Sequence, residues 1–165
     1  MQHIFLATKG YLMSKCKHYT ESIIYQLEQT ARYCKFLGLQ VFKKLGFEIS
    51  VDEFTALDVI MQNDGICQRE LAKLLLKDRA NTGRILNALE NSGYIKRSID
   101  TKNNRLIKKV KLTELGRNTT EKISQTLTDY FGDYTRIFPE QERETLIDLV
   151  KTFRNSLEKE VEMKI

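Results

Sequence analysis

The chain has 165 residues, 41% of them hydrophobic and 30% charged, with one proline, eight glycines and a formal net charge of +5. This composition predicts a single globular domain over residues 1–165 and excludes a fibrous, low-complexity or disordered protein. Because no stretch approaches 18 consecutive apolar residues, we expect no membrane span and a cytoplasmic location.

The first part of the chain predicts two helices. Apolar residues recur at helical spacing from Tyr19 to Leu45, and Gly46 fits the position just beyond a helix end. Ser50 and Glu53 have capping-box spacing, which predicts a short second helix that ends at a turn over residues 63–65. The apolar residues of the first helix are Ile23, Leu27, Ala31, Cys34, Val41 and Leu45, with Cys34 expected in the core.

Two further predicted helices are short and lie close together. Cys67 and Glu70 repeat the capping-box spacing before a helix whose apolar residues are Leu71, Ala72, Leu74 and Leu75. Asp78 suits the N-cap of a helix from Arg79 to Ser92, with Thr82, Ile85, Leu86 and Leu89 facing inward. Two short helices with a few residues between them are typical of a helix-turn-helix.

A β-hairpin and two helices are expected next. Residues 94–99 and 106–112 alternate with a period of two, and the polar stretch 100–105 between them predicts a loop. One helix starts at Thr113-Glu114 and continues to about Tyr134. Another starts near Pro139 and carries an apolar stripe at 146, 150, 153, 157 and 161.

This order of elements predicts a mainly α fold with a small β-hairpin wing. We expect a winged helix-turn-helix lobe over residues 50–112, of which 66–112 reads DNA. The apolar faces of the first and last helices exceed what so small a lobe covers, so we expect residues 19–46 and 113–163 to form dimerisation helices.

Positive charge is concentrated in the segment from Ile66 to Leu112. This segment holds twelve Lys or Arg and four Asp or Glu, whereas the rest of the chain holds 15 basic and 18 acidic residues. Such a distribution is typical of a surface that neutralises phosphates, the alternative being an ordinary solvated face.

The second helix of a helix-turn-helix enters the major groove, so its outward residues are candidates for base contacts. Asn pairs well with adenine and Arg with guanine, while a residue at the helix start also suits a phosphate. The hairpin is basic and suits the DNA backbone and the minor groove, with Lys102 or Arg105 at its tip and Asp100 available to pair with Arg105. The predicted DNA-binding residues are Gln68, Arg79, Asn81, Arg84, Asn87, Lys96, Arg97, Lys102, Asn103, Arg105, Lys108 and Lys109.

From about residue 19 to 160 the chain resembles the MarR family of winged helix-turn-helix transcription regulators. The resemblance implies a homodimer that binds a pseudo-palindromic operator in double-stranded DNA, most often a repressor released by a small aromatic or anionic effector or by an oxidant. Two departures concern Lys102-Asn103, where the family's wing has Arg-Asp, and Gly83, where a hydroxyl residue is common. The matching stretches are 68–75, 78–90, 92–95, 100–105 and 110–117.

Two cysteines are candidate redox sensors. Cys67 lies at a predicted helix N-terminus, whose dipole favours thiolate, and Cys16 has Lys15, Lys17 and His18 around it. The alternative is that either cysteine is a small inert residue.

We expect no enzymatic activity, no cofactor and no metal. Both histidines lie in the first eighteen residues, no glycine-rich phosphate loop is present, and the three cysteines lack metal-ligand spacing. The main alternative function is an architectural or protein-binding winged helix without operator specificity.

Overall fold

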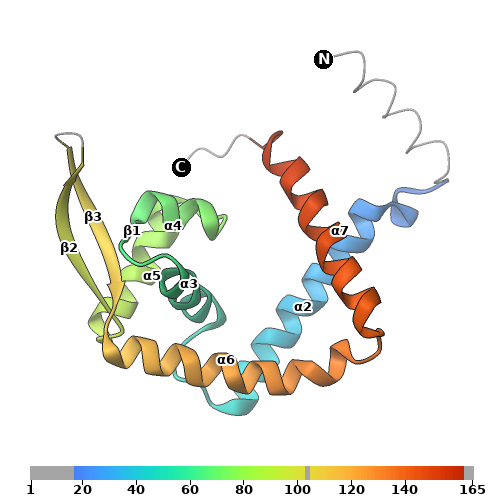
Figure 1. Cartoon of the computed structure of the whole chain (residues 1–165), viewed down its shortest axis with the longest axis horizontal. Coiled ribbons are helices and arrows are strands. Elements are labelled where there is room, and N and C mark those ends of the chain that lie inside the picture. The colour runs from blue at the N-terminus through green and yellow to red at the C-terminus, as the bar shows by residue number, and fades with distance from the viewer. Residues whose placement is uncertain (1–16, 103–104, 162–165) are drawn as a thin grey trace. The chain divides into compact units, whose positions relative to one another are not determined.

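The computed structural model describes residues 17–102 and 105–161 (Figure 1). It is mainly helical with a three-stranded antiparallel sheet, which confirms the expected fold class. The chain divides into two compact units between Val51 and Asp52.

The first unit contains the 3-10 helix η1 (Tyr19–Glu21) and helix α2 (Ile23–Leu45). The α-helix begins later than the sequence predicts because Ser22 caps it, its Oγ accepting from the Tyr25 N–H at 3.2 Å. Gly46 ends the helix with φ 66°, as expected. Val41 and Phe42 are buried, but Cys34 is exposed. The expectation that Cys34 belongs to the core of this chain is therefore wrong.

The second unit begins with α3 (Val51–Gln62), whose first residue is the last of the first unit, followed by β1 (Ile66–Cys67), α4 (Gln68–Leu74) and α5 (Arg79–Asn91). Its most deeply buried side chains come from helices α3, α4 and α5, with one each from the last strand and the helix that follows it. They include Leu57 and Ile60 of α3, Leu71 of α4, Thr82, Leu86 and Leu89 of α5, and also Val110 and Thr120. The predicted inward side of α5 is confirmed, with Ile85 half-buried beside the three buried residues, whereas Leu74 of α4 is exposed.

The turn between α4 and α5 is closed by backbone hydrogen bonds. The Lys77 N–H donates to the Ala72 carbonyl at 3.0 Å and the Leu76 N–H donates to the Lys73 carbonyl at 3.1 Å. This pattern is a Schellman motif, in which the residue after the cap adopts the left-handed conformation. Leu76 takes that position with φ 51° and a side chain that is 71% exposed.

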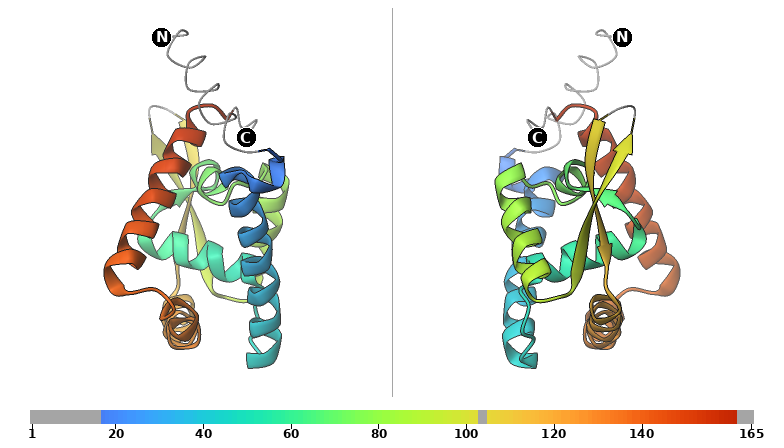
Figure 2. Two further views of the ribbon diagram at one scale, coloured as in Figure 1. Left: turned by 90° about the vertical axis from the view of Figure 1, so that its right-hand side faces the viewer. Right: turned by 90° about the vertical axis from the view of Figure 1, so that its left-hand side faces the viewer.

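The sheet has the order β1-β3-β2, with β2 at Ile95–Lys102 and β3 at Arg105–Leu112. Strands β2 and β3 form a twisted ribbon that extends beyond α4 and α5 (Figures 1 and 2). The prediction of a loop over 100–105 is wrong, because Asp100 pairs with Ile107 and the ladder continues to Lys102 and Arg105. Strand β1 was not expected, since two residues are too few to show a period of two.

Two helices complete the second unit: α6 (Glu114–Thr135) and α7 (Glu140–Glu158). Thr113 caps α6, as predicted, its Oγ1 accepting from the Gly116 N–H at 3.0 Å. Helix α7 has no buried side chain and begins directly after Pro139. Its exposed apolar residues include Leu146, Leu149, Val150 and Leu157.

Candidate nucleic-acid interface

Helix α5 presents a polar surface because its apolar side is used in the core. Thr82, Leu86 and Leu89 are buried, whereas Arg84 and Asn87 are exposed and Asn81 is half-buried. Asp78 caps the helix by accepting from the Asn81 N–H at 2.7 Å. A helix held in this way by α4 has the geometry that places a recognition helix in the major groove.

Asp78, Asn81 and Arg84 form a continuous hydrogen-bonded chain on this surface. The Asn81 Nδ2 donates to the Asp78 carboxylate, and an Nη of Arg84 donates to the Asn81 Oδ1. The hydrogen bonds from Asn81 hold the pKa of Asp78 below its usual range, with a smaller contribution from the charge of Arg84. Asp78 is therefore a carboxylate at neutral pH and gives the chain a negative end.

Gln68 lies between the two helices of the helix-turn-helix. Its Nε2 donates to the carbonyl of Arg79 at 3.4 Å, and a Cβ on Gly83 would lie 3.4 Å from the same nitrogen. Gly83 therefore lies on the side of α5 that faces α4. Gln68 and Gly83 let the helices approach closely at the start of α5. Arg79 is exposed at that helix start.

Arg97 ties the wing to α5. Its Nε donates to Glu90 at 2.8 Å, an Nη also pairs with Glu90, and an Nη donates to the Asn87 Oδ1 at 2.8 Å. The hydrogen bond from Arg97 is the largest influence that lowers the pKa of Glu90. Two residues predicted to contact DNA, Asn87 and Arg97, are therefore bonded to each other. Glu90 was not identified from the sequence, since its partner lies on a different element.

The lysines on the two faces of the wing differ in whether they form ion pairs with described residues. Lys108 shares a face with Val110 and Arg97, the side that reaches α5, and its ammonium makes no ion pair with the described residues. On the other face, Lys109 pairs with Asp100 at 2.5 Å and Lys111 pairs with Asp64 at 2.6 Å. Asp100 raises the pKa of Lys109, and Lys111 lowers that of Asp64. Lys96 is exposed on this second face.

Some of the predicted site positions lie partly or wholly outside the described residues. Asn103 and Cys16 lie outside the described residues, as do the side chains of Lys102 and Arg105, so the proposed pairing of Asp100 with Arg105 is not described either. Cys67 is half-buried at the start of α4, and its N–H donates to the Glu70 Oε2 at 3.3 Å. This bond is the Glu70 half of the predicted capping box.

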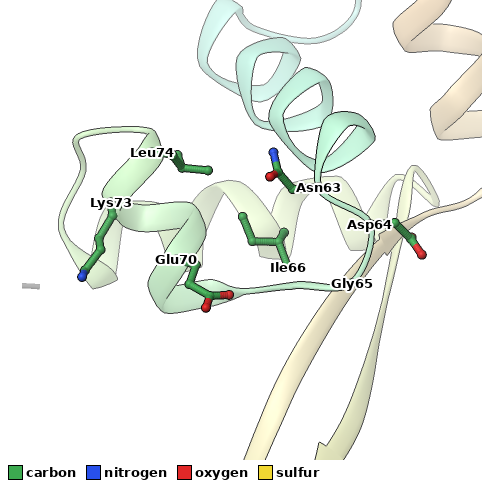
Figure 3. Close-up of a pocket in the computed structure, with 7 residues that line it drawn as sticks. All are labelled: Asn63, Asp64, Gly65, Ile66, Glu70, Lys73 and Leu74. Atoms are coloured by element: carbon green, nitrogen blue, oxygen red, sulfur yellow. The ribbon is translucent and has the colours of Figure 1, made fainter. Parts of the chain in front are cut away.

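A surface pocket of about 500 Å³ lies beside the turn between α3 and α4 (Figure 3). It is lined by Asn63, Asp64, Gly65, Ile66, Glu70, Lys73 and Leu74.

Within the described ranges, no three His, Cys, Asp or Glu side chains gather in a group that could hold a metal ion. No helix in the same ranges is both long enough and apolar enough to cross a membrane.

Comparison with known proteins finds transcription regulators that are similar to this chain in sequence and in fold. Residues 49–107 match the model of the MarR family. YybA, an uncharacterized HTH-type transcriptional regulator of Bacillus subtilis (strain 168), is 28% identical over 144 residues, which cover 85% of this chain and 91% of YybA. The transcriptional regulator SlyA has a TM-score of 0.71 at 25% identity, over 84% of this chain and 95% of SlyA.

A structure of Staphylococcus aureus MepR in complex with DNA shows the same fold. It has a TM-score of 0.68 at 21% identity, over 85% of this chain and 99% of MepR. The helix-turn-helix and the hairpin therefore have the winged-helix fold of these regulators.

Proposed function

From the MarR-family match of residues 49–107 and the MarR fold of the described chain, we propose that this protein is a dimeric, sequence-specific DNA-binding regulator. It binds a pseudo-palindromic operator as a repressor and is released by a small ligand or an oxidant. MarR-family regulators bind DNA. The pseudo-palindromic operator, the dimer and the release of the protein from DNA are proposed in addition.

The observation that carries the proposal is the arrangement of α5 and the wing. Helix α5 is fixed by its buried residues and presents Arg79 and Arg84, and Arg97 bonds the basic ribbon to that same helix. A helix and a ribbon fixed to each other can contact base edges and phosphates together. We assign base readout to Arg84, and backbone contacts to Arg79 and Lys108. Lys102, Asn103 and Arg105 are the proposed minor-groove tip.

The dimer is supported by apolar surface that each helix leaves exposed. On α7, Leu149 is 63% exposed and Leu146, Val150 and Leu157 are exposed with it. On α2, Ile23, Tyr33 and Phe36 are likewise exposed. Surfaces of this kind are typical of protein interfaces. We propose that residues 19–46 and 113–163 pair between two copies, which would set the recognition helices about 34 Å apart.

The release step concerns a small aromatic or anionic effector or an oxidant acting on Cys16 or Cys67. Treating the wild-type protein and the Cys16→Ser and Cys67→Ser variants with peroxide tests the oxidant. We expect DNA release from the wild type and its loss in one variant. If peroxide releases both variants from DNA as fully as it releases the wild type, neither thiol is the sensor.

Selection of bound sequences from a random duplex pool tests the main proposal. A dimeric regulator is expected to enrich a short palindrome, and a footprint on that duplex should cover two half-sites. Uniform recovery of all sequences would favour the architectural or protein-binding alternative.

A further inference from the structure

Asn81 has both ends of its side-chain amide engaged. Its Nδ2 donates to Asp78, and its Oδ1 accepts from Arg84. The two partners have opposite charges, so this orientation of the amide is the one in which both bonds form. Asn81 thus bridges an anion and a cation on the surface of α5.

Direct recognition of adenine would require both of these amide atoms. An asparagine that reads adenine accepts from the N6 amino group through Oδ1 and donates to N7 through Nδ2. In this structure, such a contact would break the bonds to Asp78 and Arg84 together. Asp78 would keep only its bonds to backbone N–H groups, and Arg84 would lose its fixed position.

Arg84 is placed differently, because its bond to Asn81 leaves part of the guanidinium available. A guanidinium has five N–H donors, and bidentate pairing with guanine O6 and N7 uses two of them. Arg84 is exposed, and none of its other donors bonds to a described residue. Its long side chain would otherwise sample many rotamers, and ordering it in advance lowers the entropic cost of binding a base.

We propose that Asn81 is a positioning residue that holds the guanidinium of Arg84 for base readout and does not read a base itself. Asp78 anchors Asn81 and thereby serves the same base contact in addition to capping the helix. This inference rests on the proposed function, since it concerns how an operator is recognised.

A double-mutant cycle on the selected duplex tests the inference. Affinities of the wild type, Arg84→Ala, Asn81→Ala and the double variant are measured on that duplex and on copies with each base pair replaced in turn. Arg84→Ala should lose about tenfold or more of the discrimination at one or two base pairs. Asn81→Ala should lose part of the discrimination at those same base pairs, and the double variant should match Arg84→Ala alone.

Asp78→Ser provides a second, independent variant. Serine keeps a good N-cap but removes the carboxylate that accepts from the Asn81 amide. We expect it to reduce discrimination at the base pairs that Arg84 reads, by less than Asn81→Ala does. Circular dichroism and thermal melting of every variant show that α5 is intact, because a loss of folding would weaken binding to all duplexes equally.

The outcomes separate the inference from the proposed function. If Asn81→Ala removes discrimination at a different base pair and its effect adds to that of Arg84→Ala, Asn81 reads a base directly and the inference is overturned. If Arg84→Ala leaves every base-pair preference unchanged, the inference is also overturned, although the wild type still binds specifically. Binding of the wild type without any sequence preference would overturn the proposed function itself.

Discussion

A Cβ atom on Gly116 would lie 2.0 Å from the backbone carbonyl oxygen of Tyr94. The same oxygen accepts from the N–H of Thr113 at 3.0 Å, and the Thr113 hydroxyl donates to the neighbouring Gly93 carbonyl at 2.7 Å. The start of α6 is therefore held against the residue that precedes β2. This contact fixes the base of the wing to the helix that follows it.

Gly116→Ala is expected to destabilise the protein by at least about 2 kcal/mol, because the backbone of Tyr94 cannot move without breaking these bonds. Urea unfolding at one protein concentration measures the change. Gly132→Ala is the matched control on the same helix, since a Cβ there meets no atom within 4 Å. The control should be neutral or more stable by about 0.5–1 kcal/mol. Equal effects of the two substitutions would contradict the proposed close contact.

The sequence predicts the helices and the inward side of α5 because periodicity and capping are local signals. Asp78, Thr113 and Gly46 occupy the helix-end positions that their residue types predict. The length of the wing strands could not be predicted in this way, since turn-forming residues at 100–105 are paired across the ribbon.

The hydrogen-bond partners of the side chains could not be predicted from local sequence patterns either. Asn81 and Asn87 both look available when only helical spacing is considered. The structure shows that each accepts a hydrogen bond from an arginine. The pairs Arg97–Glu90 and Lys111–Asp64 join residues on different elements, which only the tertiary fold brings together. Part of the positive charge counted from the sequence is therefore neutralised inside the lobe.

Leu76→Gly is expected to stabilise the protein by about 1 kcal/mol. Leu76 has φ 51°, a region that costs an L-residue with a Cβ about 1–2 kcal/mol, and its exposed side chain contributes little packing in return. The shift in the urea midpoint measures the gain. Leu76→Ala is the control, because alanine keeps the Cβ and should not stabilise. A similar gain from both variants would show that the exposed side chain, and not the backbone conformation, is unfavourable.

Glu90→Gln should lower the melting temperature at pH 7 by roughly a few degrees. Arg97 holds the pKa of Glu90 below its ordinary value of 4.5 in the folded state. The stabilisation is therefore fully present above that value and is lost as the pH falls through the folded-state pKa. Melting curves of the variant and the wild type should differ at pH 7 and converge in acid. Glu121→Gln, an exposed residue of α6 that pairs with no described residue, should follow the wild type throughout. A pH-independent difference for Glu90→Gln would mean that the charge of Glu90 does not stabilise the fold.

Lys108→Ala should weaken binding to operator and random duplexes about equally and reduce the salt slope by roughly 0.9, the value for one phosphate contact. Lys108 lies on the face of the wing that reaches α5, and its ammonium makes no ion pair with a described residue. Lys109→Ala should reduce the slope less, because Lys109 already pairs with Asp100 on the opposite face. Fluorescence anisotropy over a series of salt concentrations measures both slopes. If Lys109→Ala gave the larger reduction, the opposite face of the ribbon would be the one that follows the DNA backbone.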